Sequence, residues 1–517
     1  MNRTARTART AWVISLTVGV ALATVQVAGA NPLSVAPLTI ISGPSPFAGC
    51  TIGASGAPGE TLYPNAEEEP WLDVNPTNSN NMISVWQQDR WSNGGAHGLA
   101  TGVTHNGGLT WNTNFAHFSE CAGGTTANGG DYERASDPWV SFAPNGDAYQ
   151  ISLSFDATTN RNGVLVSKSS NGGDNWSEPT SLIRDSGNRD VGFAFNDKES
   201  ITADPTNSNY AYAVWDRFTT PAGNSMANIE GAIKARSFRE PIWFSRTTDG
   251  GQTWEPARII YDRSEFNGTI GNQIVVLPNG DLINIFDEFF VHKNSDKQRG
   301  ESISIIKSTD KGATWSRTST VVAASLERGA FDPDTGRPIR AEGGIPEIAV
   351  DRSTGKLYAV WQDTRFSGVD EIALSTSSDG GNSWSAPIKV NQTPRNATLA
   401  DDQAFVPNIR VADDGSVAVT YYDFRNNDSS PGVPTDAWIV RCASNCASAG
   451  SWSDEARLSS TSFDIEQAPA ARGPFGYFLG EYEGLANVGN SFVFAFIQVN
   501  NGNPANRTDL FGTRVTP

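Results

Sequence analysis

The stretches "TTDGGQTW" (Thr247–Trp254) and "SSDGGNSW" (Ser377–Trp384) are nearly the same eight-residue sequence, written twice in one chain. Three further copies are "THNGGLTW" (104–111), "SSNGGDNW" (169–176) and "STDKGATW" (308–315). With a shorter sixth copy, their tryptophans recur every 61 to 78 residues: Trp111, Trp176, Trp254, Trp315, Trp384 and Trp452. A spacing this regular indicates a repeat architecture.

A second repeat lies between these copies. It consists of an apolar strand, a turn rich in Asn, Asp, Pro and Gly, and another strand that ends in an aspartate, a pattern that predicts β-hairpins. The six aspartates are Asp89, Asp156, Asp216, Asp287, Asp363 and Asp423, and a seventh copy has Gln498 in that place. Each unit therefore predicts four antiparallel strands, and such units repeated around an axis form a β-propeller.

The number of units predicts an all-β propeller of seven four-stranded blades, with six blades as the alternative because the last unit ends after a third strand. The segment 35–44, "VAPLTIISGP", resembles the fourth strand at 385–394, "SAPIKVNQTP". We therefore expect the N-terminal segment to supply the missing outer strand of the last blade and to close the ring.

The N-terminus has the pattern of an export signal. Arg3, Arg6 and Arg9 precede an apolar run over 11–27, and small residues at 28–30 fit a cleavage site. The sequence thus predicts a signal peptide over 1–30, with a retained membrane anchor as the alternative, and a single propeller domain over 31–517. We expect a secreted or extracytoplasmic monomer that is not inserted in a membrane after cleavage.

The net charge limits the possible binding partners, and the cysteines and histidines indicate which disulfides and metal sites to expect. The formal net charge of −18 becomes −21 when three arginines leave with the signal peptide, which argues against nucleic acid or an anionic membrane as partner. For an exported chain with four cysteines we expect the disulfides Cys442–Cys446 and Cys50–Cys121, with free thiols as the alternative. No CxxC pair is present and the histidines are scattered, so we expect neither a metal nor a cofactor. Bound calcium stays open, but no motif indicates it.

The pattern Ser/Thr-x-Asp-x-Gly-x-x-Trp resembles the Asp-box, or BNR repeat, of sialidase-like β-propellers. Asp249, Asp310 and Asp379 keep the aspartate, whereas Asn106 and Asn171 replace it. The resemblance covers nearly the whole mature chain and implies that these boxes are structural turns between outer strands. The superfamily includes sialidases, other glycan-active propellers and binding modules without activity.

Strand order predicts where a site would lie. Turns between the first and second strands share one face with the boxes, so the entrances of the first strands lie on the opposite face, around the axis. Charged residues at these entrances differ from unit to unit, as a one-sided site requires; they include Glu67, Glu68, Glu69, Asp137, Asp197, Lys198, Glu199, Glu347, Asp401, Asp402, Glu481 and Glu483. We expect the recurring aspartates at the second-strand ends to hold their own loops.

The resemblance also implies a catalytic set. "GEYEGL" (480–485) is similar to the context of the sialidase nucleophile, which implies Tyr482 as nucleophile, Glu347 as its base and Asp137 as acid. A neighbouring base lowers the cost of ionising a phenol. The carboxylate clamp would be Arg134, Arg340 and Arg425, because guanidinium groups grip carboxylates. Tyr482 as an ordinary inner-strand aromatic is the alternative.

The sequence thus predicts a secreted glycan-active protein, in its most specific form an exo-acting, sialidase-like glycoside hydrolase. Two departures weigh against a true sialidase: the early Arg-Ile-Pro motif is absent, and seven units exceed the six blades of that family. A variant of this hypothesis uses two carboxylates on a neutral sugar. The alternative is a non-catalytic propeller that binds a glycan or protein at the cell surface.

Overall fold

A computed structural model describes residues 33–186, 193–220, 238–291, 298–341, 345–396, 398–471 and 476–517. The chain divides into two units, Met1–Asn31 and Pro32–Pro517. The expected signal peptide over 1–30 lies outside the described residues, so only the second unit is considered below.

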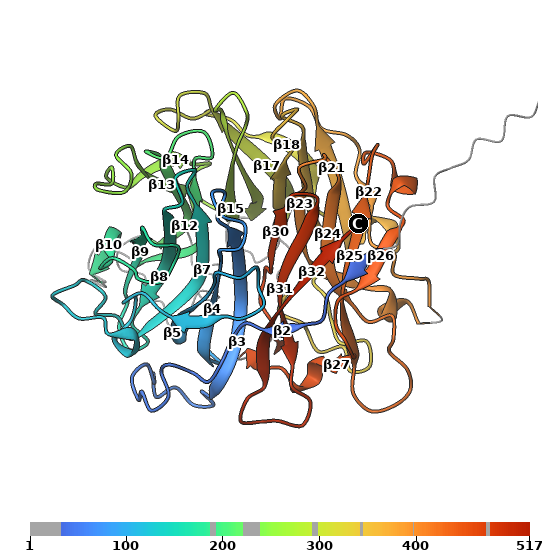
Figure 1. Cartoon of the computed structure of the whole chain (residues 1–517), viewed down its shortest axis with the longest axis horizontal. Helices are drawn as coiled ribbons and strands as arrows, with labels where there is room; N and C mark the ends of the chain where they lie inside the picture. The colour runs from blue at the N-terminus through green and yellow to red at the C-terminus, as the bar shows by residue number, and fades with distance from the viewer. Residues whose placement is uncertain are drawn as a thin grey trace, which may run out of the picture. The chain divides into compact units, whose positions relative to one another are not determined.

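Strands dominate the described residues and follow one another in antiparallel groups of four (Figure 1). The first three groups are β3 (Leu62–Val74), β4 (Met82–Trp91), β5 (Ala96–Thr104) and β6 (Asn112–Asn114); β7 (Arg134–Phe142), β8 (Ala148–Phe155), β9 (Arg161–Ser169) and β10 (Thr180–Ser186); and β11 (Phe193–Ala203), β12 (Ala211–Thr220), β13 (Ile242–Thr247) and β14 (Arg258–Tyr261). The next three are β15 (Asn267–Val276), β16 (Leu282–Val291), β17 (Gln298–Ser308) and β18 (Thr320–Ala324); β19 (Glu347–Val350), β20 (Leu357–Asp363), β21 (Glu371–Ser377) and β22 (Ile388–Lys389); and β23 (Ala404–Val411), β24 (Val417–Asp423), β25 (Pro434–Cys442) and β26 (Asp454–Arg457). Short strands β27 (Phe463–Asp464), β28 (Ala470–Ala471) and β29 (Gly476–Tyr477) precede the last group.

The last group is completed by the N-terminal segment. Strands β30 (Gly484–Val488), β31 (Ser491–Val499) and β32 (Thr508–Thr516) pair in that order, and β1 (Ser34–Val35) and β2 (Thr39–Ile40) both pair antiparallel with β32. The sequence predicted this outer strand from the likeness of 35–44 to 385–394, and the pairing confirms it. The segment at 34–40 is thereby hydrogen-bonded to the C-terminal strand β32.

Hydrogen bonds link successive groups, in most cases between their first strands, and lead back to the start. They join β3 to β7 (Asp73 and Phe142), β7 to β11 (Ser141 and Ala203), β11 to β15 (Ser200 and Asn272), β15 to β19 (Gln273 and Ile348), β20 to β23 (Gln362 and Val406), β23 to β30 (Arg410 and Asn487), and the segment before β30 to β3 (Leu479 and Glu69). In Figure 1, β7, β15, β23 and β30 lie nearer the middle than β10, β14, β22 and β26. The predicted all-β class and four-stranded antiparallel sheets are confirmed, as in a β-propeller; the blade count stays a prediction.

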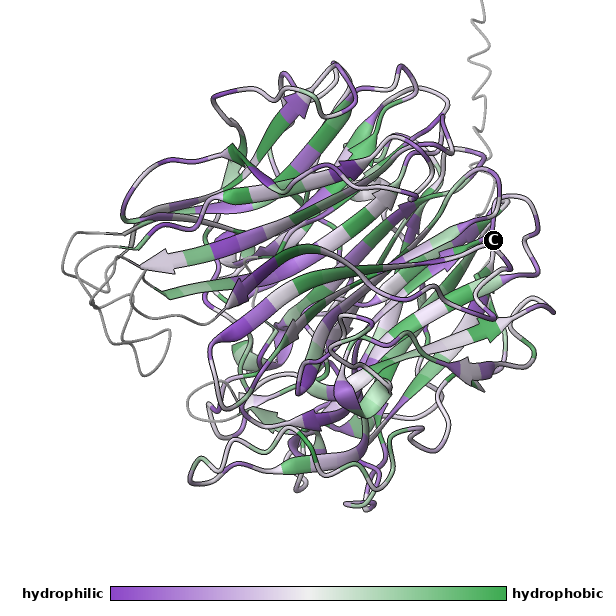
Figure 2. Ribbon diagram, turned by 90° about the vertical axis from the view of Figure 1, so that its left-hand side faces the viewer, coloured by the Kyte–Doolittle hydropathy of each residue, from purple (hydrophilic) through white to green (hydrophobic). Residues whose placement is uncertain are grey.

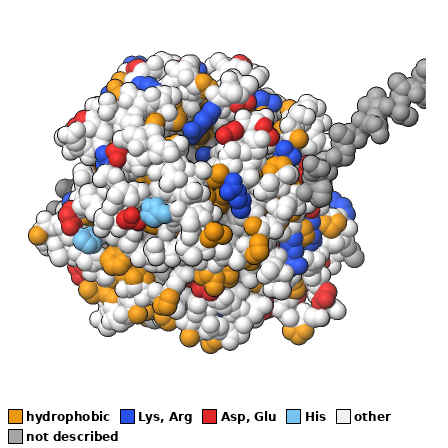
Figure 3. Space-filling model, viewed as in Figure 1, with side chains coloured by type: hydrophobic (Ala, Val, Ile, Leu, Met, Phe, Trp, Pro, Cys, Tyr) orange, Lys and Arg blue, Asp and Glu red, His pale blue; other side chains and the backbone are white. Residues whose placement is uncertain are grey.

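The hydrophobic core lies between neighbouring sheets. Trp86, Trp215 and Trp361 occupy equivalent places in the second strands and are each 0% exposed. Burying side chains of this size supplies most of the favourable free energy of packing. Single strands carry both hydrophobic and hydrophilic segments (Figure 2), because one strand contributes to the core and to polar ends. On the face shown in Figure 3, acidic and basic side chains lie interspersed.

The five eight-residue copies, hereafter the box turns, connect the third and fourth strands of their groups. In the turn at 247–254, the carboxylate of Asp249 accepts hydrogen bonds from the Thr247 hydroxyl and the Thr253 amide. The amide of Gly250 donates to Asn209 in the turn between β11 and β12, so both kinds of turn share a face, as strand order predicted. Two tryptophans of the box turns pack against aromatic rings of the preceding group: Trp254 contacts Tyr149, and Trp315 contacts Phe244.

We expect Asp310→Ala to lower the free energy of unfolding by about 1 kcal/mol, because it removes three hydrogen bonds from a partly solvated turn. The Ser308 hydroxyl and the Thr314 amide each donate to Oδ1 at 2.8 Å, and the Thr314 hydroxyl donates to Oδ2 at 2.6 Å. Asp310→Asn is the matched control, since Asn106 and Asn171 form the same turn with an amide oxygen. Equal urea midpoints for the alanine and asparagine variants would contradict this role.

Two disulfides stabilise the fold, and both are the expected pairs. Cys50 is bonded to Cys121 across a separation of 71 residues, and Cys442 to Cys446 across four. The second closes a small loop below Trp452, whose indole Nε1 donates to the carbonyl of Cys446. That loop stands where the other groups have a complete box turn.

Candidate active site

Backbone bulges place charged side chains from three first strands at one end of the sheets. The pairing register shifts at this level in β3, β7, β11, β15 and β23. A residue with positive φ sits at each shift: Glu69 (52°), Asp137 (52°), Lys198 (49°), Gly271 (72°) and Val406 (50°). A non-glycine residue in this region costs on the order of 1 kcal/mol, and such strain concentrates at functional sites. Charge occurs at this position only in the first three of these strands.

The three charged residues meet two others in a buried group that we call the central charge cluster: Glu69, Asp137, Lys198, Arg340 and Glu481. The Lys198 ammonium lies 3.2 Å from Glu69 Oε1 and 3.5 Å from Asp137 Oδ1, and it also pairs with Glu481. Arg340 Nε donates to the other oxygen of Glu481 at 2.7 Å. The Lys198 side chain is 5% exposed and that of Glu481 is 0% exposed, whereas that of Arg340 is 21% exposed. Arg340 is therefore the member that reaches solvent.

The carboxyl groups of the cluster differ in protonation. Burial raises the pKa of Glu69 to about 8, against the opposing effect of Lys198. Burial also opposes ionisation of Asp137, but Lys198 and hydrogen bonds from Glu69 and Asp197 outweigh it and lower its pKa. Arg340 and Lys198 likewise overcome burial and lower the pKa of Glu481. At neutral pH the arrangement holds a protonated Glu69 hydrogen-bonded to an ionised Asp137, an acid and a base side by side.

Tyr482 lies next to this cluster, at a place where the phenol stays neutral. Its ring packs against Trp71 and Trp139, and its hydroxyl donates to the carbonyl of Pro138 at 3.3 Å. Burial, followed by the charges of Glu69 and Asp137 among other carboxylates, raises the pKa of Tyr482 well above its usual value. A phenol that is this hard to ionise is a weak nucleophile, so the electrostatics do not favour the nucleophilic role expected from the sequence.

A small cavity of about 20 Å³ borders both Tyr482 and Glu347. Lys198 and Glu199 also line it, and its volume has room for about one water molecule. Burial raises the pKa of Glu347 to about 8, although a hydrogen bond with Gln273 acts in the opposite direction. Glu347 is therefore largely protonated at neutral pH, and no hydrogen bond of the described residues joins it to Tyr482 as a base.

The buried carboxyl of Glu347 makes stability depend on pH. Its folded pKa is raised, so its contribution to stability is fully present below pH 4.5 and is lost as pH rises toward 8. We expect Glu347→Gln to remove this loss, which amounts to about 1.4 kcal/mol per pH unit within that window. Melting temperatures from pH 4 to 9 measure the effect, with the exposed Glu120→Gln as control. Parallel curves for Glu347→Gln and the parent would show that Glu347 ionises normally.

The guanidinium group of Arg134 is hydrogen-bonded to loop residues. Its Nε donates to the carbonyl of Gly53 at 2.7 Å, its Nη1 to Asn93 Oδ1 at 2.9 Å, and its Nη2 to Glu60 Oε1 at 2.6 Å. The residue is 1% exposed. Since its donors are used by the loops around 53 and 93, Arg134 does not face the central charge cluster as a substrate clamp.

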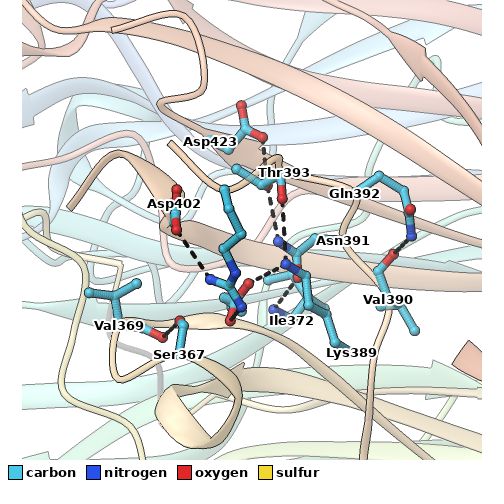
Figure 4. Close-up of polar contacts among 12 residues, drawn as sticks. Ser367, Val369, Ile372, Lys389, Val390, Asn391, Gln392, Thr393, Asp402 and Asp423 are labelled. Carbon is cyan, nitrogen blue, oxygen red and sulfur yellow. Dashed lines mark hydrogen bonds and ion pairs between the residues drawn. The ribbon is translucent and has the colours of Figure 1, made fainter. Parts of the chain in front are cut away.

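The guanidinium group of Arg425 is hydrogen-bonded to carboxylates of its own sheet. Its Nε donates to Asp423 Oδ2 and its Nη1 to Glu455 Oε2, both at 2.6 Å, and the guanidinium stacks on Trp438. The Thr393 hydroxyl donates to the same carboxylate of Asp423 at 2.7 Å, beside contacts of Lys389 and Asp402 (Figure 4). The expected convergence of Arg134, Arg340 and Arg425 is thus absent from the described contacts, because two of them satisfy carboxylates of separate sheets.

Three of the recurring aspartates at the second-strand ends bind nearby segments, and Asp363 caps its own loop. Asp216 accepts hydrogen bonds from the Thr269 hydroxyl, the Gly271 amide and the Asn272 side chain. Asp89 and Asp363 hold neighbouring loop residues in the same way. These carboxylates are therefore occupied by the protein itself.

The structure brings together four of the six expected catalytic and clamp residues: Asp137, Arg340, Glu347 and Tyr482. Sequence reasoning counted Glu69, Lys198 and Glu481 among the charged strand entrances without giving them a role. The usable signal was their position: Glu69, Asp137 and Lys198 occupy the same place in three successive units, just before the apolar part of the first strand.

The described residues lack two features, a metal-binding cluster and a membrane-spanning helix. They contain no group of three or more His, Cys, Asp or Glu side chains arranged to hold a metal ion. They also contain no helix with the length and apolar character needed to cross a membrane.

No protein-family model matches the chain, and no curated protein matches it either. Similar solved structures include a protein of unknown function from Dyadobacter fermentans, 14% identical over 74% of this chain and 94% of that one, with a TM-score of 0.43. They also include the Hadza microbial sialidase Hz136, 14% identical over 85% and 74%, with a TM-score of 0.45. An α-L-arabinofuranosidase from Fusarium graminearum is 10% identical over 88% and 96%, with a TM-score of 0.42. The solved structures to which the chain is similar, at low identity, thus include a sialidase and an α-L-arabinofuranosidase.

Proposed function

We propose that this chain is a glycan-active hydrolase that cleaves glycosidic bonds of neutral sugars, with Glu69 and Asp137 as its acid and base. The observation that carries this proposal is the pairing of a carboxyl of raised pKa with one of lowered pKa, both at strained backbone positions. Glycoside hydrolysis uses two carboxyl groups with separated pKa values that flank the scissile bond, so the sugar would enter between Glu69 and Asp137. Lys198 lowers the pKa of both carboxyl groups and is the largest of the effects that hold the pKa of Asp137 below its usual value despite burial.

The chemistry follows from these protonation states. Glu69 donates its proton to the glycosidic oxygen as the bond to the anomeric carbon breaks. Water adds to that carbon and gives a proton to Asp137, whose negative charge also stabilises the positively charged transition state. Once the products leave, Glu69 and Asp137 regain their hydrogen bond, through which the proton returns to Glu69 for the next turnover. Arg340, the exposed member of the cluster, would orient the sugar hydroxyls.

Three observations favour a neutral sugar over a sialoside. The phenol of Tyr482 is held neutral by burial and nearby carboxylates. Arg134 and Arg425 are occupied elsewhere. The only guanidinium of the expected clamp at the cluster, Arg340, already pairs with Glu481. Among the described residues, the expected clamp therefore offers a substrate carboxylate no guanidinium without another carboxylate partner, and burying an unpaired charge is costly.

We also propose the finer points of architecture and location. The ring of first-strand hydrogen bonds and the N-terminal strand of the last group support seven blades. Two disulfides support an oxidising, extracytoplasmic location. A monomer with a glycan as its partner, and without a cofactor, is consistent with a site built from one chain.

A non-catalytic propeller that binds a glycan or protein is the second candidate. It is favoured by the arginines that pair with the aspartate of their own strand end, Arg365 with Asp363 and Arg425 with Asp423. Such pairs stabilise the fold, and their guanidinium groups are then not available to clamp a substrate.

An aryl-glycoside screen of the purified mature chain separates these functions. We expect turnover of at least one neutral pyranoside or furanoside, no turnover of an aryl sialoside, and retained activity in Tyr482→Phe. Turnover of the sialoside that disappears in Tyr482→Phe would restore the sialidase hypothesis. Binding on a glycan array without any turnover would favour the non-catalytic propeller.

A further inference from the structure

A second, larger cavity lies away from the central charge cluster. It has a volume of about 440 Å³, within the range of roughly 300–1,000 Å³ that is typical of small-molecule sites. The end of β31 and the connection to β32 form one wall, and the segment before and within β27 forms the other. The lining residues are Thr461, Ser462, Phe463, Gln498, Val499, Asn500, Asn501, Asn503, Asn506 and Asp509.

The lining is polar but nearly uncharged. Amide and hydroxyl side chains predominate, and among the described residues that line it there is neither a lysine nor an arginine. The single carboxylate, Asp509, already accepts hydrogen bonds from the side-chain amides of Asn500 at 2.9 Å and Asn506 at 3.1 Å. A surface of this kind offers many donors and acceptors but no charge to pair with an ion.

Two amide oxygens at this cavity lack hydrogen-bond partners. Gln498 Oε1 and Asn506 Oδ1 are both inaccessible to solvent and accept no hydrogen bond from the described residues. An unsatisfied buried acceptor costs about 1–3 kcal/mol. Because solvent does not reach either oxygen, a ligand in the cavity would meet them only after the amide side chain turns, and that turn would relieve this cost. Gln498 also breaks the repeat, because every earlier unit has an aspartate there. Three of these aspartates accept hydrogen bonds from the protein: Asp89 from Asn65, Asp216 from Thr269 of the next group and Asp363 from Arg365.

We propose that this cavity binds a neutral saccharide through its hydroxyl groups. Each sugar hydroxyl donates one hydrogen bond and accepts others, which matches amide side chains that do both. Hydroxyls of the sugar would donate to Gln498 Oε1 and Asn506 Oδ1 once these amides turn toward the cavity. Side-chain amides of the rim, such as that of Asn503, would donate to ring and hydroxyl oxygens. A sialic acid or another anion is disfavoured because no cation lines the cavity.

The site is separate from the proposed hydrolytic centre, although the two are linked through the same sheet edge. The hydroxyl of Thr508, beside Asp509, donates to the carbonyl of Glu67 at 2.9 Å, two residues from Glu69. The proposal does not rest on hydrolysis, since a binding site of this kind would serve a hydrolase or a non-catalytic propeller equally.

Calorimetric titration of the Asp137→Asn variant tests the proposal, because that variant would not consume the probes. The probes are L-arabinose, D-galactose, lactose and N-acetylneuraminic acid. We expect binding of at least one neutral probe, and Gln498→Leu and Asn503→Ala should each weaken it by tenfold or more. Asn382→Ala, an exposed asparagine in a box turn, is the matched control and should leave the affinity unchanged.

The titrations can either support or overturn the proposed saccharide site. Asn503 is exposed, so Asn503→Ala keeps the test valid if Gln498→Leu does not fold, and melting temperatures establish which variants are folded. The proposal is overturned if no neutral probe binds, if the two variants bind as tightly as the control, or if N-acetylneuraminic acid binds more tightly than every neutral sugar. Hydrolysis is measured separately on the unmodified chain, so failure of one proposal leaves the other intact.

Discussion

Asp137→Asn is expected to lower kcat/KM for a neutral aryl glycoside by about 10³-fold, within the range that a general acid or base contributes. The substitution removes the ionised carboxylate to which Glu69 is hydrogen-bonded and leaves the shape of the side chain unchanged. The loss should appear mainly in kcat, because the negative charge acts on the transition state rather than on the bound sugar. Initial rates on the best substrate of the screen measure it.

Asp216→Asn is the matched control for this prediction. Asp216 is also a buried aspartate near a first strand, but its partners are Thr269, Gly271 and Asn272 rather than the central charge cluster. The control should retain activity within severalfold. If Asp137→Asn kept more than a tenth of the activity while remaining folded, Asp137 would have no part in the chemistry.

Lys198→Met should cause the largest loss of stability, about 3–5 kcal/mol at pH 7, because it leaves buried carboxylates without their cation. Lys198 is the member of the cluster that faces Glu69, Asp137 and Glu481 together. Without it, burial raises the pKa of Asp137 and of Glu481, so the loss should shrink as pH falls to 5 and these groups take up protons. Chemical denaturation at pH 5 and 7 measures both values.

Lys168→Met serves as the comparison, since the Lys168–Asp147 pair has a lysine side chain that is 28% exposed. An exposed pair contributes about 1 kcal/mol or less. Equal effects of the two substitutions, or a loss at Lys198 that does not change with pH, would mean that the central cluster is solvated.

Much of the fold could be predicted because its signals are local and repeated. The box turns depend on hydrogen bonds within eight residues, and the hairpins depend on turn residues between two apolar strands. The N-terminal outer strand was predictable because 35–44 resembles a fourth strand elsewhere in the chain. The bulges that carry Glu69, Asp137 and Lys198 were not, because the left-handed backbone there depends on packing between neighbouring sheets.

The site was only partly predictable because the sequence does not show which arginine pairs with which carboxylate. Arg134, Arg340 and Arg425 all stand at strand ends, and the choice of carboxylate partner decides what each can do. Arg134 pairs with Glu60, 74 residues away, and Arg425 with Glu455, 30 residues away. Neither partner is marked by a motif. The protonation of Glu69 and Tyr482 depends on burial among several carboxylates, which one strand's sequence does not specify.

The pH dependence of kcat/KM tests most directly whether Glu69 is the acid beside an ionised Asp137. Glu69 must be protonated to act, so activity should persist through neutral pH and fall above its raised pKa of about 8. With a dinitrophenyl leaving group that needs no acid, Glu69→Gln should retain the parent's rate, and neither protein should show this alkaline fall. A profile that already falls above pH 5, or an unchanged alkaline fall in Glu69→Gln, would contradict the assignment.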